Sequence, residues 1–135
     1  MYKKNPTGLV AVFLFVIAGS IYAQQESKLV NPVEAYNLLK MDDTIVLLDV
    51  RTPAEFKSET GHLKGAILIP VQELENRIDE IVKYKKRTVI VYCRTGHRST
   101  AGAEILSENG FKAFNMTGGI TRWTAEKFPV EKNTQ

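Results

Sequence analysis

A single cysteine stands in a short segment that could hold and activate a thiolate. The segment reads Cys93-Arg94-Thr95-Gly96-His97-Arg98-Ser99. Such a loop can curl until its backbone N–H groups converge on one point, and Gly96 permits the dihedral angles that curling requires. Arg94 and Arg98 add two positive charges. We therefore expect the pKa of Cys93 to lie below its ordinary value. The same donors would hold a sulfur atom bound to Cys93 as a persulfide anion.

Cys93 and the two histidines also have simpler interpretations than nucleophile or base. A free cysteine is often a small buried hydrophobic residue, but two arginines, a glycine and a helix start within six residues argue against that here. We expect His97 to be an exposed loop residue, although it could tune the loop electrostatically or move a proton. His62, in the turn 61–66, is expected to hydrogen-bond backbone rather than to act as a base.

The spacing of the loop separates two kinds of cysteine chemistry. Cysteine phosphatases place five residues between the cysteine and the arginine that closes their anion-binding loop, whereas four lie between Cys93 and Arg98. The shorter loop predicts a tighter cavity, which favours a terminal sulfur over a tetrahedral oxyanion. One cysteine and two histidines also argue against a metal site, and we expect no cofactor.

Length and composition indicate what kind of protein contains this loop. The 135 residues are 44% hydrophobic and 24% charged, which is typical of one globular domain and excludes a disordered tail or a multi-span membrane protein. Two of the 18 basic residues lie in residues 1–23, which leaves 16 against 15 acidic residues, a net charge of +1. Such a balance argues against nucleic-acid binding.

The first 23 residues have the pattern of an export signal. Lys3 and Lys4 precede the apolar run Leu9–Ile17, and small residues follow before Ala23. We predict cleavage after Ala23, a single domain over 24–135, and an exported, periplasmic protein that is free of the membrane after cleavage. The alternative is a retained N-terminal anchor, although the apolar run is shorter than the ~20 residues that a spanning helix needs.

The remaining sequence alternates between strand and helix patterns. Asn31, Pro32 and Glu34 form a helix start. The predicted strands are 45–50, 66–70, 88–92 and 111–116, and the predicted helices or helical turns are 31–39, 53–57, 71–81, 99–109 and 120–125. Ser99 is expected to cap its helix, and the tail from Glu131 is expected to fray. This order predicts an α/β fold, with a parallel sheet covered by helices on both faces.

Cys93 directly follows the clearest predicted strand, 88–92. Ligands of parallel sheets bind beyond the carboxyl ends of the strands. The start of the next helix would add its positive end to the same place. The elements therefore put the cysteine loop where a substrate would bind.

Four segments, in this order and spacing, resemble single-domain rhodaneses from about Val30 to Phe128. The segments are 48–56 (LDVRTPAEF), 61–66 with Ile69-Pro70, 91–99 (VYCRTGHRS), and Gly118-Gly119-Ile120 with Trp123. The predicted leader makes the chain similar to exported rhodaneses of the phage-shock type. The resemblance implies a five-stranded parallel sheet flanked by helices.

The resemblance also implies thiosulfate sulfurtransferase chemistry in two half-reactions. Cys93 would take the outer sulfur of thiosulfate or a related donor and pass it from a persulfide to cyanide, a thiol or a protein acceptor. Residues 94–99 would cradle the persulfide, with Arg94 and Arg98 binding the donor or holding the loop together. Asp49 and Arg51 are interpreted as structural braces near the active face, with direct substrate contact as the alternative, and Glu55 as part of the scaffold.

Three other functions use the same residues. Cys93 could report sulfide or oxidants in a sensing module, could relay sulfur only to a protein partner, or could serve a phosphatase or arsenate reductase. The short loop argues against the phosphatase or arsenate reductase. The intact cysteine also argues weakly against a module with a purely structural role. No additional apolar stripe demands a dimer, so we expect a monomer.

Overall fold

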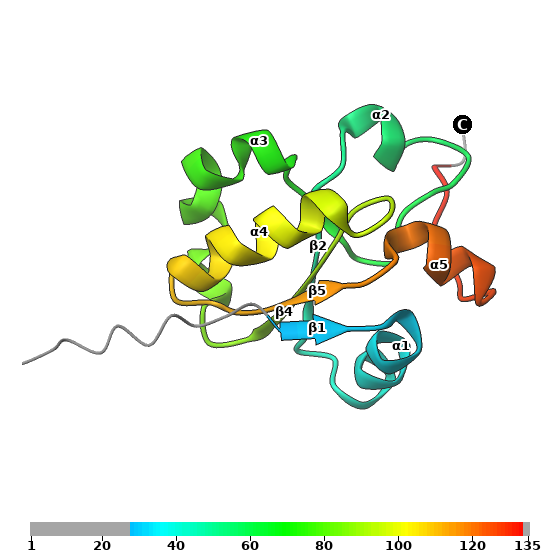
Figure 1. Ribbon diagram of the computed structural model, residues 1–135, viewed down its shortest axis with the longest axis horizontal. Helices are drawn as coiled ribbons and strands as arrows, with labels where there is room; N and C mark the ends of the chain where they lie inside the picture. Colours follow the sequence, from blue (N-terminus) through cyan, green and yellow to red (C-terminus); the bar gives the residue numbers. More distant parts are fainter. Residues whose placement is uncertain (1–27, 134–135) are drawn as a thin grey trace, which may run out of the picture.

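Five parallel strands form the centre of the molecule, in the order β1-β5-β4-β2-β3. The computed structural model describes residues 28–133 (Figure 1), so the predicted leader over residues 1–23 lies outside the described residues. The strands are β1 (Lys28–Val30), β2 (Val46–Asp49), β3 (Ile67–Leu68), β4 (Thr88–Tyr92) and β5 (Lys112–Met116). The predicted parallel α/β sheet is therefore confirmed.

Helices cover both faces of this sheet. They are α1 (Pro32–Met41), α2 (Pro53–Phe56), α3 (Val71–Leu74), α4 (His97–Glu108) and α5 (Gly119–Ala125), with the 3-10 helices η1 (Glu75–Glu80) and η2 (Val82–Tyr84). Figure 1 shows α3 and α4 on one side of the sheet and α1 on the other. The capping box predicted at the start of α1 is present, since Asn31 and Glu34 each accept a hydrogen bond from the other's backbone N–H.

Two apolar cores follow from the alternation of side chains along the strands. Val89, Val91 and Cys93 belong to the core beneath α3 and α4. Ile90 and Tyr92 belong to the core beneath α1 and α5. The alternation therefore directs Cys93, the first residue after β4, toward the face that α4 covers.

Two predicted elements differ from the structure. Strand β1 was not predicted, because only Val30 of its three residues is buried and so short a segment shows no alternation. The predicted helix over 71–81 is instead α3 followed by 3-10 turns, with non-helical backbone at Arg77. Leu74 and Ile81 still reach the core, so short turns satisfy the same apolar positions that suggested one helix.

The C-terminal tail is also more ordered than predicted. Glu131 forms an antiparallel bridge with His62, through N–H to oxygen hydrogen bonds of 2.8 and 2.9 Å. The expectation that fraying begins at Glu131 is therefore wrong for Glu131 itself, because backbone pairing with a distant loop holds a residue that has no local signal. None of the helices between residues 28 and 133 has the length and apolar character needed to cross a membrane.

Candidate active site

Cys93 lies at the carboxyl end of β4 and is almost completely buried, with 1% of its surface exposed. The N–H of Gly96 donates a hydrogen bond to its Sγ over 3.1 Å. The Ser99 hydroxyl lies 3.4 Å from the same sulfur. The loop therefore curls around the sulfur, with a backbone donor directed at it and a hydroxyl group within hydrogen-bond distance.

Gly96 makes this curl possible. Its φ of +98° lies in the left-handed region, and it directly precedes the first residue of α4, His97. The prediction that Ser99 caps this helix is wrong, because Gly96 turns the chain into the helix earlier and places Ser99 inside the first turn. The Ser99 hydroxyl is consequently free of capping and bonds instead with Asn115 and Cys93.

The pKa of Cys93 is lowered, in the direction expected. Burial of the thiol acts in the opposite sense and is the largest single influence, but the hydrogen bonds to the sulfur together outweigh it. Those bonds come from the Ser99 hydroxyl and from the backbone N–H groups of Ser99, Gly96 and Thr95. The loop geometry, more than the arginine charges, accounts for the shift.

Arg98 is engaged by a carboxylate that the sequence did not assign to the site. Its guanidinium donates two hydrogen bonds to Glu55 of α2, over 2.7 and 2.8 Å. This fork-shaped pairing ties α4 to α2 and neutralises much of the charge that Arg98 would contribute. Of the two roles left open for this arginine, the geometry favours holding the loop together.

The Glu55 carboxylate is held by its own helix as well as by Arg98. Thr52 and Glu55 form a capping box at the start of α2, in which Thr52 N–H and Oγ1 both donate to the Glu55 carboxylate over 3.0 Å. The Thr-x-x-Glu spacing of residues 52–55 is the sequence signal that could have identified this box. Nothing local indicated that its carboxylate would also reach residue 98.

Replacing Glu55 by glutamine should remove an acid-sensitive contribution to stability. Arg98 lowers the pKa of Glu55 from 4.5 to about 2. Because the folded state has the lower pKa, this contribution is complete above pH 4.5 and is lost as the pH falls through about 2. The difference in unfolding free energy between wild type and Glu55→Gln should therefore shrink across that window. A difference that stays constant from pH 6 to pH 2 would contradict this, and Glu59→Gln, in a fully exposed side chain, is the matched control.

Asp49 and Arg51 form a buried ion pair beside the site. Arg51 Nη2 lies 2.7 Å from Asp49 Oδ2, and the two side chains are 2% and 0% exposed. Arg51 also donates to the carbonyl oxygens of Gly61 and Glu55, over 2.8 and 3.4 Å. The pair thus connects β2 to α2, whose Glu55 carboxylate holds Arg98, and this is the geometry of a brace.

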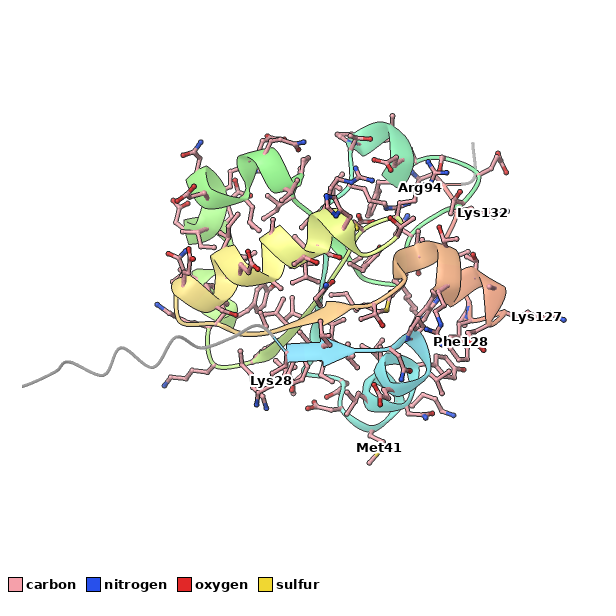
Figure 2. The ribbon with its side chains drawn as sticks, in the orientation of Figure 1. Lys28, Met41, Arg94, Lys127, Phe128 and Lys132 are labelled. Atoms are coloured by element: carbon pink, nitrogen blue, oxygen red, sulfur yellow. The ribbon has the colours of Figure 1, made fainter. Side chains whose placement is uncertain are left out.

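The remaining loop residues lie at the surface. Arg94, Thr95 and His97 are exposed, and Figure 2 shows Arg94 on the loop that leads into α4. Within residues 28–133 the guanidinium of Arg94 makes no hydrogen bond or ion pair. Arg94 is therefore the loop arginine whose charge is available to an incoming anion.

His62 contacts backbone at the end of α2. Its Nδ1 is 3.2 Å from the carbonyl oxygen of Phe56, and its ring stacks on the Phe56 ring. This is the backbone contact expected for a turn histidine. In the part of the chain that the structure describes, no group of three His, Cys, Asp or Glu side chains is placed to hold a metal ion.

A hollow of about 690 Å³ lies elsewhere on the molecule. Tyr36 of α1, Leu47 of β2, Leu63 and Trp123 of α5 are among the residues that line it, and none of residues 93–99 does. The arrangement around the sulfur is therefore made by the loop itself and not by this hollow.

Comparison with known proteins assigns the chain to a family. Residues 31–126 match the rhodanese-like domain. The chain belongs to the rhodanese family. Among its relatives, the thiosulfate sulfurtransferase PspE of Escherichia coli (strain K12) is 42% identical over 73 residues, which cover 54% of this chain and 68% of PspE. A sulfurtransferase of Allochromatium vinosum is 33% identical over 106 residues, which cover 76% of this chain and 95% of that protein.

A solved rhodanese-related structure agrees with this assignment. The crystal structure of that protein from Thermoplasma volcanium has a TM-score of 0.69 and 31% identity, and the match covers 77% of this chain and 97% of that one. The recognition of a single-domain rhodanese from its four sequence segments is therefore confirmed.

In this rhodanese domain, the start of α5 supports the cysteine loop from behind. The N–H groups of Ile120 and Thr121 donate to the carbonyl oxygens of Cys93 and Arg94, over 2.9 and 3.0 Å. Gly119 lies against the same carbonyl groups, and a Cβ at this position would collide with both. The sequence indicated a turn at Gly118-Gly119, and the structure shows that this turn also lets α5 approach the loop.

Gly119→Ala should therefore displace the cysteine loop. Gly65→Ala is the matched control, since Gly119 and Gly65 have φ of +58° and +74° but a Cβ on Gly65 would meet no atom within 4 Å. Both variants carry the backbone strain of a positive φ, about 1 kcal/mol. Only Gly119→Ala is expected to lose sulfurtransferase activity and to shift the Cys93 alkylation rate. Equal activity of the two variants would contradict the supporting role of this contact.

Proposed function

We propose that this chain is a sulfurtransferase that carries sulfane sulfur as a persulfide on Cys93. The observation that supports it best is the buried Cys93 sulfur, which meets hydrogen-bond donors of its loop and has a lowered pKa. Membership of the rhodanese family, and relatives named as sulfurtransferases, support the same reaction class.

The first half-reaction uses thiosulfate or a related anion as sulfur donor. The Cys93 thiolate attacks the outer sulfur, a bond forms between the two sulfurs, and the sulfur–sulfur bond of thiosulfate breaks. Sulfite leaves with the electron pair of that bond, and the outer sulfur keeps the negative charge that it carried in thiosulfate, now as the terminal sulfur of the persulfide. The N–H donors of the loop stabilise that anionic terminal sulfur without reorganising.

The second half-reaction returns the enzyme to its starting state. A thiophilic acceptor such as cyanide attacks the outer sulfur of the persulfide, and the electron pair of the breaking sulfur–sulfur bond returns to Cys93. Cyanide gives thiocyanate, and a small thiol or a protein thiol would give a persulfide. No cofactor enters either step, because both transfer one sulfur atom between nucleophiles.

Intact-mass spectrometry of the purified protein tests this proposal. Thiosulfate should add the mass of one sulfur atom, and cyanide should remove it with formation of an equal amount of thiocyanate. A folded protein with a free thiol that gains no sulfur and forms no thiocyanate would overturn the proposal in favour of a dedicated relay or a sensing module.

Arg94→Ala should raise the KM for thiosulfate, because Arg94 is exposed and its charge faces no partner within residues 28–133. Loss of one hydrogen bond to the thiosulfate anion corresponds to a rise in KM of roughly tenfold. Steady-state kinetics measures this, and Lys86→Ala, an exposed cation in the turn before β4, is the control. An unchanged KM would refute donor binding by Arg94.

We also propose that residues 1–23 direct export to the periplasm and are removed after Ala23. The proposal rests on the order of basic, apolar and small residues in that segment. Cell fractionation with N-terminal sequencing tests it. A mature protein that begins at Gln24 is expected, and a membrane-bound protein that retains Met1 would show a permanent anchor instead.

A further inference from the structure

The Ser99 hydroxyl stands between two acceptors. It lies 2.6 Å from Oδ1 of Asn115, on β5, and 3.4 Å from Sγ of Cys93. Ser99 and Asn115 are 0% and 4% exposed, so neither side chain can readily replace a lost partner with water. A hydroxyl group has one proton, and Ser99 can therefore give it to only one of these two acceptors at a time.

The orientation of the Asn115 amide follows from its other contacts. Its Nδ2 lies 3.4 Å from the carbonyl oxygen of Gly96 and 3.0 Å from Oγ1 of Thr100. The carbonyl can only accept, and the Thr100 hydroxyl already donates to it over 2.9 Å. Both contacts therefore require the amide NH₂ group, which leaves Oδ1 facing Ser99 as an acceptor.

The two protonation states of Cys93 make opposite demands on Ser99. While the thiol is neutral, Ser99 can donate to Asn115 and accept the S–H of Cys93. When the thiol proton leaves to solvent, a lone pair of Ser99 would face the thiolate. The hydroxyl group must then turn toward the sulfur, which leaves the buried Oδ1 of Asn115 without its donor.

We propose that Asn115 is a positioning residue that governs how readily Cys93 loses its proton, by competing with the sulfur for the Ser99 hydroxyl proton. Asn115 does not touch the reacting sulfur and acts through Ser99. The inference rests on the proposed role of Cys93 as the reactive thiol, but it concerns the thiol before any sulfur is transferred. The available sequence signal was a polar amide inside a largely apolar strand.

The other charged side chains near the cysteine loop are the same in the wild type and in both Asn115 variants. They are Arg94 and His97 in the loop, Arg98 on α4 with its partner Glu55 on α2, Asp49 on β2 and Arg122 on α5. Of these, Arg98 interacts electrostatically with both Cys93 and Asp49. None is altered by substitution at Asn115, so a change in thiol titration in Asn115→Leu reports the Ser99 hydrogen bond, whereas Asn115→Asp also adds the direct effect of its own charge.

The test is the pH dependence of Cys93 alkylation by iodoacetamide in two variants. Asn115→Leu removes the competing acceptor, so the midpoint should fall by about one pH unit, the scale of one hydrogen bond to a charged group. Asn115→Asp, nearly isosteric, holds the Ser99 proton more tightly, so the midpoint should rise. General damage to the loop would not move the two variants in opposite directions. No downward shift in Asn115→Leu would overturn the proposal, and so would no upward shift in Asn115→Asp.

A Ser99→Ala background shows whether the effect passes through Ser99. There, Asn115→Leu should leave the midpoint unchanged, and the shift in Asn115→Asp should shrink to the direct effect of its charge. Equal shifts in both backgrounds would overturn the proposal. Thr100→Val, which removes one acceptor of the Asn115 NH₂ group, should have little effect. Alkylation needs no sulfur donor, so these outcomes test the proposal even if thiosulfate loads no sulfur onto Cys93. If Asn115→Leu does not fold, the comparison of Asn115→Asp in the two backgrounds tests the proposal instead.

Discussion

Cys93→Ser is expected to abolish sulfur transfer while leaving the fold intact. Serine keeps nearly the same shape in this buried position, but its hydroxyl neither ionises near neutral pH nor carries a sulfane sulfur. Removing a nucleophile lowers turnover by on the order of 10³-fold or more. Thiocyanate formation should fall to background, and the protein should gain no sulfur mass with thiosulfate.

Ser107→Ala provides the matched control for this substitution. Ser107 is also buried on the α4 side of the sheet, and its hydroxyl finds no hydrogen-bond partner among residues 28–133. Its loss should change neither the activity nor the melting temperature to a large degree. Turnover close to wild type in Cys93→Ser would contradict the persulfide mechanism, whereas loss of folding would show that Cys93 is first of all a packing residue.

Asp49→Ala is expected to cause the largest loss of stability. The Arg51 guanidinium is 2% exposed and takes its anionic partner from Asp49. Removal of one partner leaves a buried, unpaired charge, which typically costs about 3–5 kcal/mol of unfolding free energy. Denaturant unfolding measures this loss. A loss below about 1 kcal/mol would contradict the view of this pair as a brace.

Two further variants separate the unpaired charge from general damage at this position. The double variant Asp49→Leu with Arg51→Met removes both charges, and it should recover part of the stability lost in Asp49→Ala. Glu80→Gln weakens the exposed ion pair of Arg77 and Glu80, and it should leave the denaturation midpoint essentially unchanged. Equal losses in the single and the double variant would indicate that packing, and not charge, is responsible.

Local patterns in the sequence were sufficient for most of the fold. Strands β2 and β4 are runs of apolar residues, and α1 begins at a capping box, so each element was visible within about ten residues of chain. The continuous helix predicted over 71–81 failed because periodic apolar positions do not distinguish one helix from a series of short turns that bury the same side chains. Strand β1 was not recognised because it is a strand only through its pairing with β5, which lies far away in sequence.

The sequence by itself determined that a lone thiol follows a buried strand and enters a loop that contains glycine and leads into a helix. These features are local, and so they are encoded by neighbouring residues. Only the tertiary structure decided which distant side chains form hydrogen bonds and ion pairs with the loop residues. Glu55 neutralises Arg98 from 43 residues away, and Asn115 engages Ser99 from 16 residues away. Such pairings depend on how the strands and helices pack, and no residue type within the loop specifies them.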